Sequence, residues 1–211
     1  MQRSVGSRFL ALVLAGAAPL CGYAASSADG AATVESVWKP VEIRYSYMAF
    51  TSAYNCDSAE AALKRILLAL GAHPQTRVRA TGCFMERPSR NFFITVTTAT
   101  PVAAGSPDLA VSDKDERELL QRLGVKSPIS GDQFAAHWQT VDLSRDRKLD
   151  LKPGDCELMK GLRDSVLPKL SVKVVTDRVQ CTPNQLSIQT PELVVSALMP
   201  LPAADKVQPA R

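Results

Sequence analysis

The amino-acid sequence predicts an α+β protein made of two β-α-β-β units, with the helices on one face of a mainly antiparallel sheet and one disulfide in each unit. Cys56 and Cys83 lie 27 positions apart, and Cys156 and Cys181 lie 25 positions apart. In each interval a helical pattern rich in leucine follows the first cysteine, and a strand pattern containing valine precedes the second. We interpret this shared order as an internal duplication.

The first unit spans residues 37–101. Its helix is expected over residues 57–70, because apolar residues recur there three and four positions apart and Gly71 follows as a terminating residue. Asp57 and Glu60 at the start of this helix have the spacing of a capping box. Alternating or β-branched residues predict the strands of this unit, at residues 41–50, 76–84 and 91–100.

The second unit spans residues 132–199 and repeats the same order of elements. A helix is expected over residues 156–167, although Gly161 weakens it by about 1 kcal/mol relative to alanine. Pro168 limits this helix at its end, because proline has no backbone N–H to donate. Strand patterns occur at residues 134–143, 171–181 and 185–199.

The N-terminal residues 1–24 have the form of a secretory signal peptide: two arginines, an apolar run and small residues. The apolar run is shorter than the about 20 residues that a membrane-spanning helix needs, and no later stretch is long enough. A lipoprotein signal at Cys21 is the alternative, but Leu20 is bulky where such signals have a small residue. We therefore expect a protein of the periplasm or the exterior with no transmembrane segment.

Three further segments complete the predicted organisation. Their residues are mainly small and polar, or rich in proline, which is typical of chain without a packed core. They are a flexible lead-in at residues 25–36, a connector at residues 102–131 with a short helix over residues 112–124, and a disordered tail at residues 200–211.

The charge of the chain argues against nucleic-acid binding. Without residues 1–24, which contain two arginines and no acid, the formal net charge falls from +4 to +2. Arg77 and Arg79 form the only basic pair that stands out on a predicted strand. Proteins that bind nucleic acid through its phosphates have a larger basic face, so we expect no such partner.

Four cysteines remain after Cys21 is removed with the signal peptide. Export and an even number of cysteines favour disulfides over metal-binding or catalytic thiols. Four cysteines allow three pairings, and the repeat selects one disulfide within each unit. The expected pairs, each contributing about 3–4 kcal/mol by loop closure, are Cys56 with Cys83 and Cys156 with Cys181.

The patterns expected of catalytic and metal sites are weak in this chain. His73 lies in a turn and His137 in a predicted strand, and neither is accompanied by a GxSxG motif or a reactive cysteine. Asp146, Asp150 and Asp155 suggest calcium, but they lack the order of a calcium loop and have basic neighbours. We therefore predict no cofactor and no metal, and we assign no catalytic residue.

The candidate partner surface lies on the first unit, where most aromatic residues occur. Arg44 and Met48 are on the opposite side of the strand at residues 41–50 from Tyr45 and Tyr47. We expect the two tyrosines to pack beneath the helix. Should this strand lie at a sheet edge, its unpaired backbone could accept an extended peptide.

Phe92 and Phe93 are adjacent on a predicted strand, so they point to opposite sides of the sheet. One of them needs a cover. Large apolar side chains are usually buried, which favours a cover from within the chain, and the alternative is a partner. The partner alternative adds Phe93 to Arg44 and Met48 in the candidate partner surface.

A family of uncharacterised exported proteobacterial proteins of about this size resembles the chain in the segment YNCDSAEAALKRILLALGA and the later GC pair. The resemblance is weaker in the second unit, through GDCELMKGLRD and the late CTP. It implies export from a Gram-negative cell. It implies no activity and no site residue.

These observations favour a non-enzymatic binding or accessory protein of the cell envelope, with an envelope protein or peptide as its partner. The alternative is a periplasmic or secreted hydrolase acting on a cell-wall or peptide substrate. A cleft with two carboxylates, or His137 beside a carboxylate and a serine, would favour the hydrolase.

Overall fold

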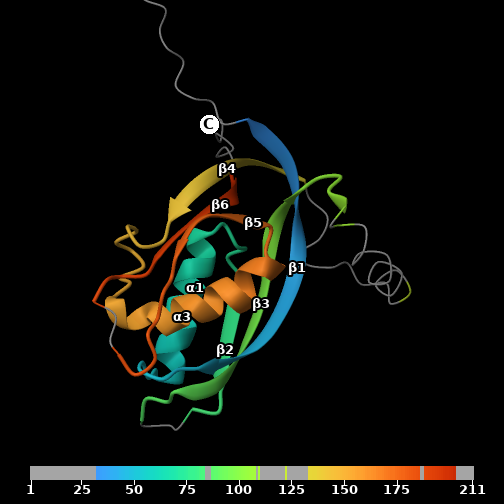
Figure 1. The fold of residues 1–211 in the computed structure, drawn as a ribbon. Helices are drawn as coiled ribbons and strands as arrows, with labels where there is room; N and C mark the ends of the chain where they lie inside the picture. The colour runs from blue at the N-terminus through green and yellow to red at the C-terminus, as the bar shows by residue number, and fades with distance from the viewer. Residues whose placement is uncertain are drawn as a thin grey trace, which may run out of the picture. The chain divides into compact units, whose positions relative to one another are not determined.

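The structure, a computed structural model, describes residues 32–83, 87–107, 109, 122, 133–185 and 188–202 (Figure 1). Among these residues, two α-helices lie against one sheet, and they are α1 (Cys56–Ala69) and α3 (Cys156–Gly161). The strands are β1 (Thr33–Met48), β2 (Arg77–Thr81), β3 (Asn91–Ala103), β4 (Phe134–Asp142), β5 (Val172–Arg178) and β6 (Glu192–Pro200). The predicted signal peptide, all of the connector helix except Arg122, and the tail from residue 203 lie outside the described residues.

All six strands belong to one antiparallel sheet in the order β2-β3-β1-β4-β6-β5, which confirms the α+β class and the antiparallel pairing. We call β1, α1, β2 and β3 half one, and β4, α3, β5 and β6 half two. In half one β3 lies between β1 and β2, and in half two β6 lies between β4 and β5. The halves therefore have the same strand order, and they join where β1 pairs with β4 over residues 33–36.

The lead-in predicted for residues 25–36 extends too far. Residues 33–36 belong to β1, where they pair with β4 on one side, and Ser36 also pairs with Ala103 of β3. The residues of this segment are mainly small and polar, so the local sequence predicts a strand only weakly. Its strand conformation depends on hydrogen-bond partners about 100 positions away along the chain, which local sequence does not reveal.

The core is one continuous cluster that contains the buried sides of both helices. It also contains the residues of one sheet face, because Ile43, Val96 and Val78 lie side by side across β1, β3 and β2, and all three are buried. In half two, Val195 and Ala197 of β6 belong to the same cluster. Both helices therefore cover the same face of the sheet, as the sequence predicts.

The helix of half two is less regular than predicted. The sequence predicts one helix over residues 156–167, but α3 ends at Gly161 and continues as a wide π-helical turn (Leu162–Val166) and a 3-10 turn (Leu167–Lys169). Pro168 explains the change, because its ring clashes with the carbonyl group four residues earlier and it has no N–H to donate. The buried residues Leu162 and Val166 still face the core through this turn.

The capping box predicted at the start of α1 does not form. The helix begins after Asn55 without a hydrogen bond from a capping side chain. Glu60 instead accepts a hydrogen bond from the backbone N–H of Ala80 in β2, with 2.7 Å between nitrogen and oxygen. Glu60 therefore bonds to the backbone of β2 and not to the start of its own helix, and it connects α1 to the edge strand of the sheet.

The two disulfides join Cys56 to Cys83 and Cys156 to Cys181, as the repeat predicts. The Cα atoms are 5.8 Å apart in the first pair and 5.7 Å apart in the second. Each bridge ties the start of a helix to the chain beyond the next strand, so the bridges occupy corresponding places in the two halves. Among the described residues, no helix has the length and apolar composition needed to cross a membrane.

Candidate binding surface and groove

The predicted partner residues lie together on the outer face of half one, which we define as the side of β1, β2 and β3 turned away from the helices. In the register of β1 with β3, Ser46 is opposite Phe93, and Arg44 and Met48 flank Ser46 two residues away on either side. Met48 is 70% exposed and Phe93 is 65% exposed, whereas Phe92 is buried on the other side. The internal cover expected for Phe93 is therefore wrong, because both helices pack on the opposite face.

The outer face carries more positive than negative charge. Arg77 and Arg79 of β2 are exposed on it, on either side of the inward-pointing Val78. On β1, a guanidinium nitrogen of Arg44 lies 2.6 Å from a carboxylate oxygen of Glu42, and both side chains are exposed. An exposed ion pair contributes about 0–1 kcal/mol, so Arg44 is available to other anions at little cost.

A groove of about 320 Å³ runs between the last part of β1 and α3. Ser46 and Met48 line one side, and Lys160 and Gly161 line the other. A side chain at Gly161 would place its Cβ only 3.3 Å from the ring of Tyr45. Glycine therefore allows the helix to approach β1 closely, which explains a residue that weakens the helix when it is considered alone.

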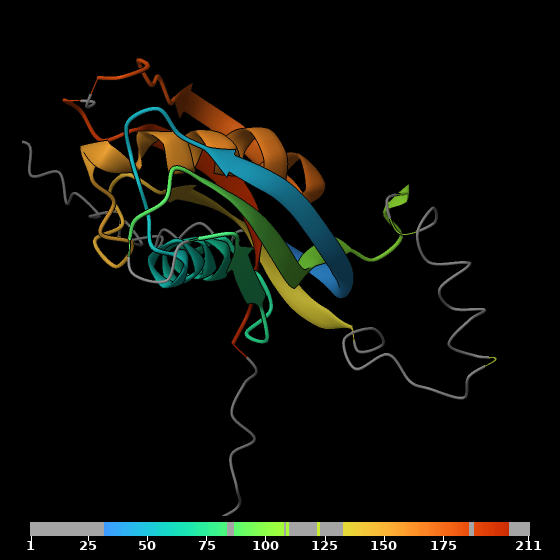
Figure 2. The ribbon, with the colours of Figure 1, turned by 90° about the horizontal axis from the view of Figure 1, so that it is seen from below.

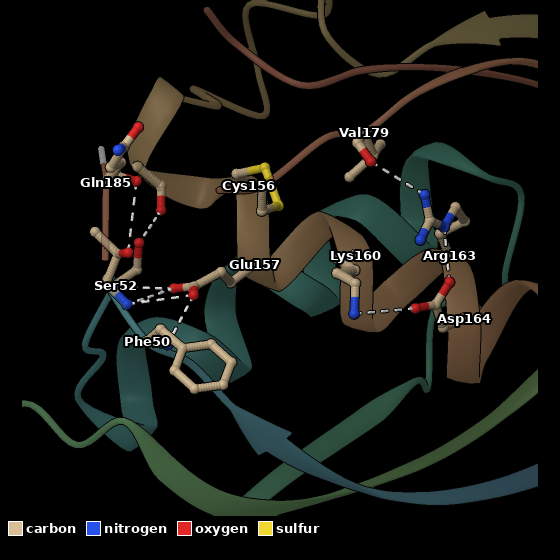
Figure 3. Close-up of a disulfide and its surroundings, with 12 residues drawn as sticks. Phe50, Ser52, Cys156, Glu157, Lys160, Arg163, Asp164, Val179 and Gln185 are labelled. Carbon is tan, nitrogen blue, oxygen red and sulfur yellow. Dashed lines mark hydrogen bonds and ion pairs between the residues drawn. A yellow bond between two sulfur atoms is a disulfide. The ribbon is translucent and has the colours of Figure 1, made fainter. Parts of the chain in front are cut away.

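Glu157 of α3 fixes the turn that closes one end of this groove (Figure 3). One carboxylate oxygen accepts the backbone N–H of Phe50 at 2.7 Å, and the other accepts the N–H groups of Thr51 at 3.1 Å and Ser52 at 2.8 Å. The hydroxyl of Ser52 donates in turn to the carbonyl of Gly154. Half two therefore holds the chain that leaves β1 through one carboxylate, which accepts three backbone N–H groups.

Three tyrosines lie behind the groove in half one. The hydroxyl of Tyr54 donates to the carboxylate of Asp155, and the hydroxyl of Tyr47 donates to the carbonyl of Ser52 at 3.2 Å. Burial raises the pKa of Tyr45, Tyr47 and Tyr54, and the hydrogen bond to Asp155 raises the pKa of Tyr54 further. The Tyr45 hydroxyl is buried and has no hydrogen-bond partner in the described part of the chain. These hydroxyls therefore stay protonated at neutral pH.

Two carboxylates line the groove, as the hydrolase hypothesis requires, but both are engaged in structural contacts. Arg163 donates to the carboxylate of Asp164 at 2.7 Å, and this bond lowers the pKa of Asp164. Glu157 accepts the three N–H groups of the turn. A general acid needs a proton to deliver at working pH, and Asp164 holds none there.

The two histidines are separate from this groove. The ring of His73 lies edge-on to Trp38, with 4.8 Å between ring centroids, and its Nδ1 accepts the N–H of Gln75 at 3.2 Å. Nδ1 of His137 is buried and has no hydrogen-bond partner among the residues that the structure describes. Within the described residues, no serine or carboxylate is bonded to His137, so the catalytic arrangement considered for it does not form there.

The aspartates considered for calcium serve as acceptors in turns. Asp146 accepts the N–H of Lys148 at 2.9 Å, and Asp155 accepts the N–H of Lys152 at 2.7 Å. In the part of the chain that the structure describes, no group of three or more metal-binding side chains is placed to hold an ion. These contacts support the solvated-loop interpretation over the calcium site.

A larger hollow of about 650 Å³ lies beside the connection between β5 and β6. It is lined mainly by exposed polar side chains, and Arg178 on its wall is paired with Glu192 at 3.0 Å. None of the residues predicted for a binding surface lies in it. We therefore base the functional interpretation on half one.

No protein-family model, curated protein or solved structure matches this chain. The functional interpretation therefore rests on the residues themselves. The sequence grouped Arg44, Met48 and Phe93 as one candidate surface, but it did not indicate Glu157 or the groove. Both depend on contacts between residues more than 100 positions apart, for which the sequence contains no local pattern.

Proposed function

We propose that this protein is an exported, disulfide-stabilised binding or accessory protein of a Gram-negative cell envelope that acts without catalysing a reaction. The observation that carries the proposal is the exposure of Met48 and Phe93 beside Arg44 on the outer face. Large apolar groups are rarely left together in water unless they contact a partner. Aromatic and arginine side chains dominate the energy of protein interfaces, which fits this combination.

Export is supported by the N-terminal sequence and by the disulfides. Residues 1–24 have the charged, apolar and small-residue regions of a signal peptide. Disulfides persist in oxidising compartments such as the periplasm and are rare in the cytosol. A protein that stays in an oxidising envelope can rely on both bridges for its stability.

We also infer that the two halves arose by internal duplication. Both halves follow the order strand, helix, edge strand, middle strand, and both close a disulfide from the helix start. The two halves meet at an antiparallel junction, where β1 pairs with β4. This origin would leave each half free to specialise, and half one carries the candidate surface.

The alternative function, a hydrolase of cell-wall or peptide substrates, has less support. It needs a carboxylic acid or a histidine placed to transfer a proton. In the groove, Asp164 is held deprotonated by Arg163, and Glu157 is engaged by backbone donors. A binding role uses the same residues without such a requirement.

Site-specific cross-linking tests the proposed function. A photo-reactive amino acid at Phe93 in cells should give a defined adduct, which mass spectrometry identifies. The matched control replaces Val175, which is 58% exposed on half two. Met48→Ser should reduce the adduct from position 93 at least fivefold without changing the yield of folded protein. Adducts that are identical at positions 93 and 175, or that are unaffected by Met48→Ser, would contradict a specific binding surface in half one.

A further inference from the structure

One edge of β1 has no neighbouring strand along most of its length. β1 pairs with β3 from Ser36 to Met48, but it pairs with β4 only over residues 33–36. From residue 37 to residue 48, the side of β1 turned away from β3 is therefore open within the described structure. β1 is central in the strand order, so this edge is not apparent from the topology alone.

The hydrogen bonds at the ends of β1 identify which residues point to this open edge. In an antiparallel pair, residues that bond to the partner alternate with residues that direct N–H and C=O away from it. The N–H of Ala49 donates to the carbonyl of Arg90 at 2.9 Å, and the N–H of Ala104 donates to the carbonyl of Glu35 at 2.7 Å. Odd-numbered residues of β1 therefore bond to β3, and even-numbered residues point to the open edge.

The open edge contains four consecutive even-numbered residues, which are Glu42, Arg44, Ser46 and Met48. All four are exposed. Apart from the ladder between β1 and β3, no hydrogen bond among the described residues involves their backbone N–H and C=O groups. Pro40, the preceding even-numbered residue, has no N–H, and proline is tolerated in strands where the N–H would face an unpaired edge.

Figure 2 shows the last part of β1, in blue, beside α3, in orange. The groove is lined by residues of both elements, so the open edge lies beside it. Ser46 and Met48 belong both to the edge and to the groove wall. The opposite wall is helical and is lined by Lys160 and Gly161. Because Glu157 holds the turn after β1, one end of the groove is formed before any ligand arrives.

We propose that an extended peptide segment of a partner protein binds here, adding as a strand to the open edge of β1 and lying in the groove against α3. A peptide backbone presents donors and acceptors at the two-residue spacing of Glu42, Arg44, Ser46 and Met48. Unpaired strand edges next to a helix-lined groove bind peptides through this main-chain match. The inference rests on the proposed binding function and specifies its ligand and its site.

The side chains beside the edge define the sequence of the segment. A strand added to β1 places alternate side chains on the outer face, next to Arg44 and Met48. Arg44 is 77% exposed in its side chain and retains donors beyond those used by Glu42, so it complements an acidic residue. Met48 and Phe50 are exposed at the closed end and complement an apolar residue. The segment therefore has an acidic and an apolar residue four positions apart.

Amide hydrogen exchange on the oxidised protein tests the edge directly. In the free protein, the N–H groups of Arg44, Ser46 and Met48 should exchange at least about a hundredfold faster than those of Tyr45 and Tyr47, which bond to β3. Uniform protection along β1 at every protein concentration would overturn the assignment of the open edge. Protection that grows with protein concentration would place a second copy of the chain there and overturn the peptide proposal.

The ligand class is tested with a displayed random heptapeptide library selected on the oxidised protein. We expect recovered peptides with an acidic and an apolar residue four positions apart. Ser46→Pro, which removes one edge N–H and adds a ring there, should weaken the best synthetic peptide at least tenfold. Thr140→Pro is the matched control, because β4 pairs with β1 only over residues 134–137 and its even-numbered residues point away from β6, as the bond from Leu143 to Leu193 shows. It should leave the affinity of the peptide within twofold. N-methylation of alternate peptide amides should abolish binding in one register only, which tests the site without altering the protein.

Each remaining outcome separates this inference from the proposed function. Peptides that bind Ser46→Pro as well as wild type but lose affinity with Phe93→Ser would overturn the edge site and leave the outer-face binding role standing. Failure to recover any binding peptide, while the cross-link from position 93 persists, would also overturn the edge site and leave the outer-face binding role standing. Loss of the cross-link together with retained edge binding would contradict the outer-face surface instead.

Discussion

Half one and half two share a strand order and a disulfide arrangement, but they differ in helix regularity and in what they expose. Half one has a continuous 14-residue helix, whereas the helix of half two has six α-helical residues before a π-helical turn. Half one exposes Met48 and Phe93 on its outer face, while half two contributes Glu157, which holds half one in place. One half therefore presents the surface, and the other supports it.

This difference shows which features the shared architecture requires. The buried positions survive the irregular helix, because Leu158, Leu162 and Val166 remain in the core although the backbone widens around them. The disulfide at the helix start also survives. Regular helical geometry is thus less important in this fold than an apolar stripe and a covalent tie.

Among the variants that compare the two halves, removal of a disulfide should have the largest effect on the free energy of unfolding. Replacing Cys56 and Cys83 by alanine, or Cys156 and Cys181 by alanine, should each lower the free energy of unfolding by about 3–4 kcal/mol, because the rings have similar length. Urea unfolding followed by circular dichroism measures both losses. A bridge whose removal leaves stability unchanged would show that the two halves do not use their disulfides in the same way.

Glu157→Ala and Glu60→Ala compare a contact between the halves with a contact inside half one. Glu157 accepts three backbone N–H groups and Glu60 accepts one. We expect losses of about 2–3 kcal/mol for Glu157→Ala and about 1 kcal/mol for Glu60→Ala, because backbone donors that lose their acceptor in a partly buried place are costly. Urea unfolding at neutral pH provides the measurement, and the reverse order would contradict the supporting role of half two.

Alkaline titration should report on half one alone, because Tyr45, Tyr47 and Tyr54 are the only tyrosines outside residues 1–24. Burial raises the pKa of all three in the folded protein, so stability is fully present below pH 10 and falls as the pH rises above it. At pH 11 the loss is about 1.4 kcal/mol for each tyrosine. Tyrosinate absorbance should appear together with unfolding. Ordinary titration near pH 10 with an unchanged fold would contradict the burial.

Asp164→Asn in half two should have the smallest effect. The hydrogen bond from Arg163 lowers the pKa of Asp164, so its contribution is present above about pH 4 and is lost as the pH falls through the lowered pKa. Its side chain is 46% exposed, which limits the effect to less than about 1 kcal/mol. The variant should flatten the decline in stability between about pH 5 and pH 2. Glu42→Gln, which removes an exposed carboxylate from half one, is the matched control. A steeper decline in Asp164→Asn would contradict this assignment.

The sequence by itself determined the disulfide pairing, the positions of both helix starts and the class of fold. These features depend on local patterns: cysteine spacing, apolar residues three and four positions apart, and alternation along strands. It also placed Arg44 and Met48 opposite Tyr45 and Tyr47, because alternation in a strand is a local geometric property. The same rule placed Phe92 and Phe93 on opposite sides of the sheet, but only the structure shows that Phe93 is the exposed one.

Only the tertiary structure decided how the two halves join and what surrounds the open edge of β1. The pairing of residues 33–36 with β4, the bonds from Glu157 to the turn after β1 and the approach of Gly161 to Tyr45 all connect distant parts of the chain. Their partners are selected by packing after the local elements have formed. A glutamate at a helix start has the same local sequence pattern whether its carboxylate faces water, its own helix or a turn about 100 positions away, and only the folded arrangement distinguishes these cases.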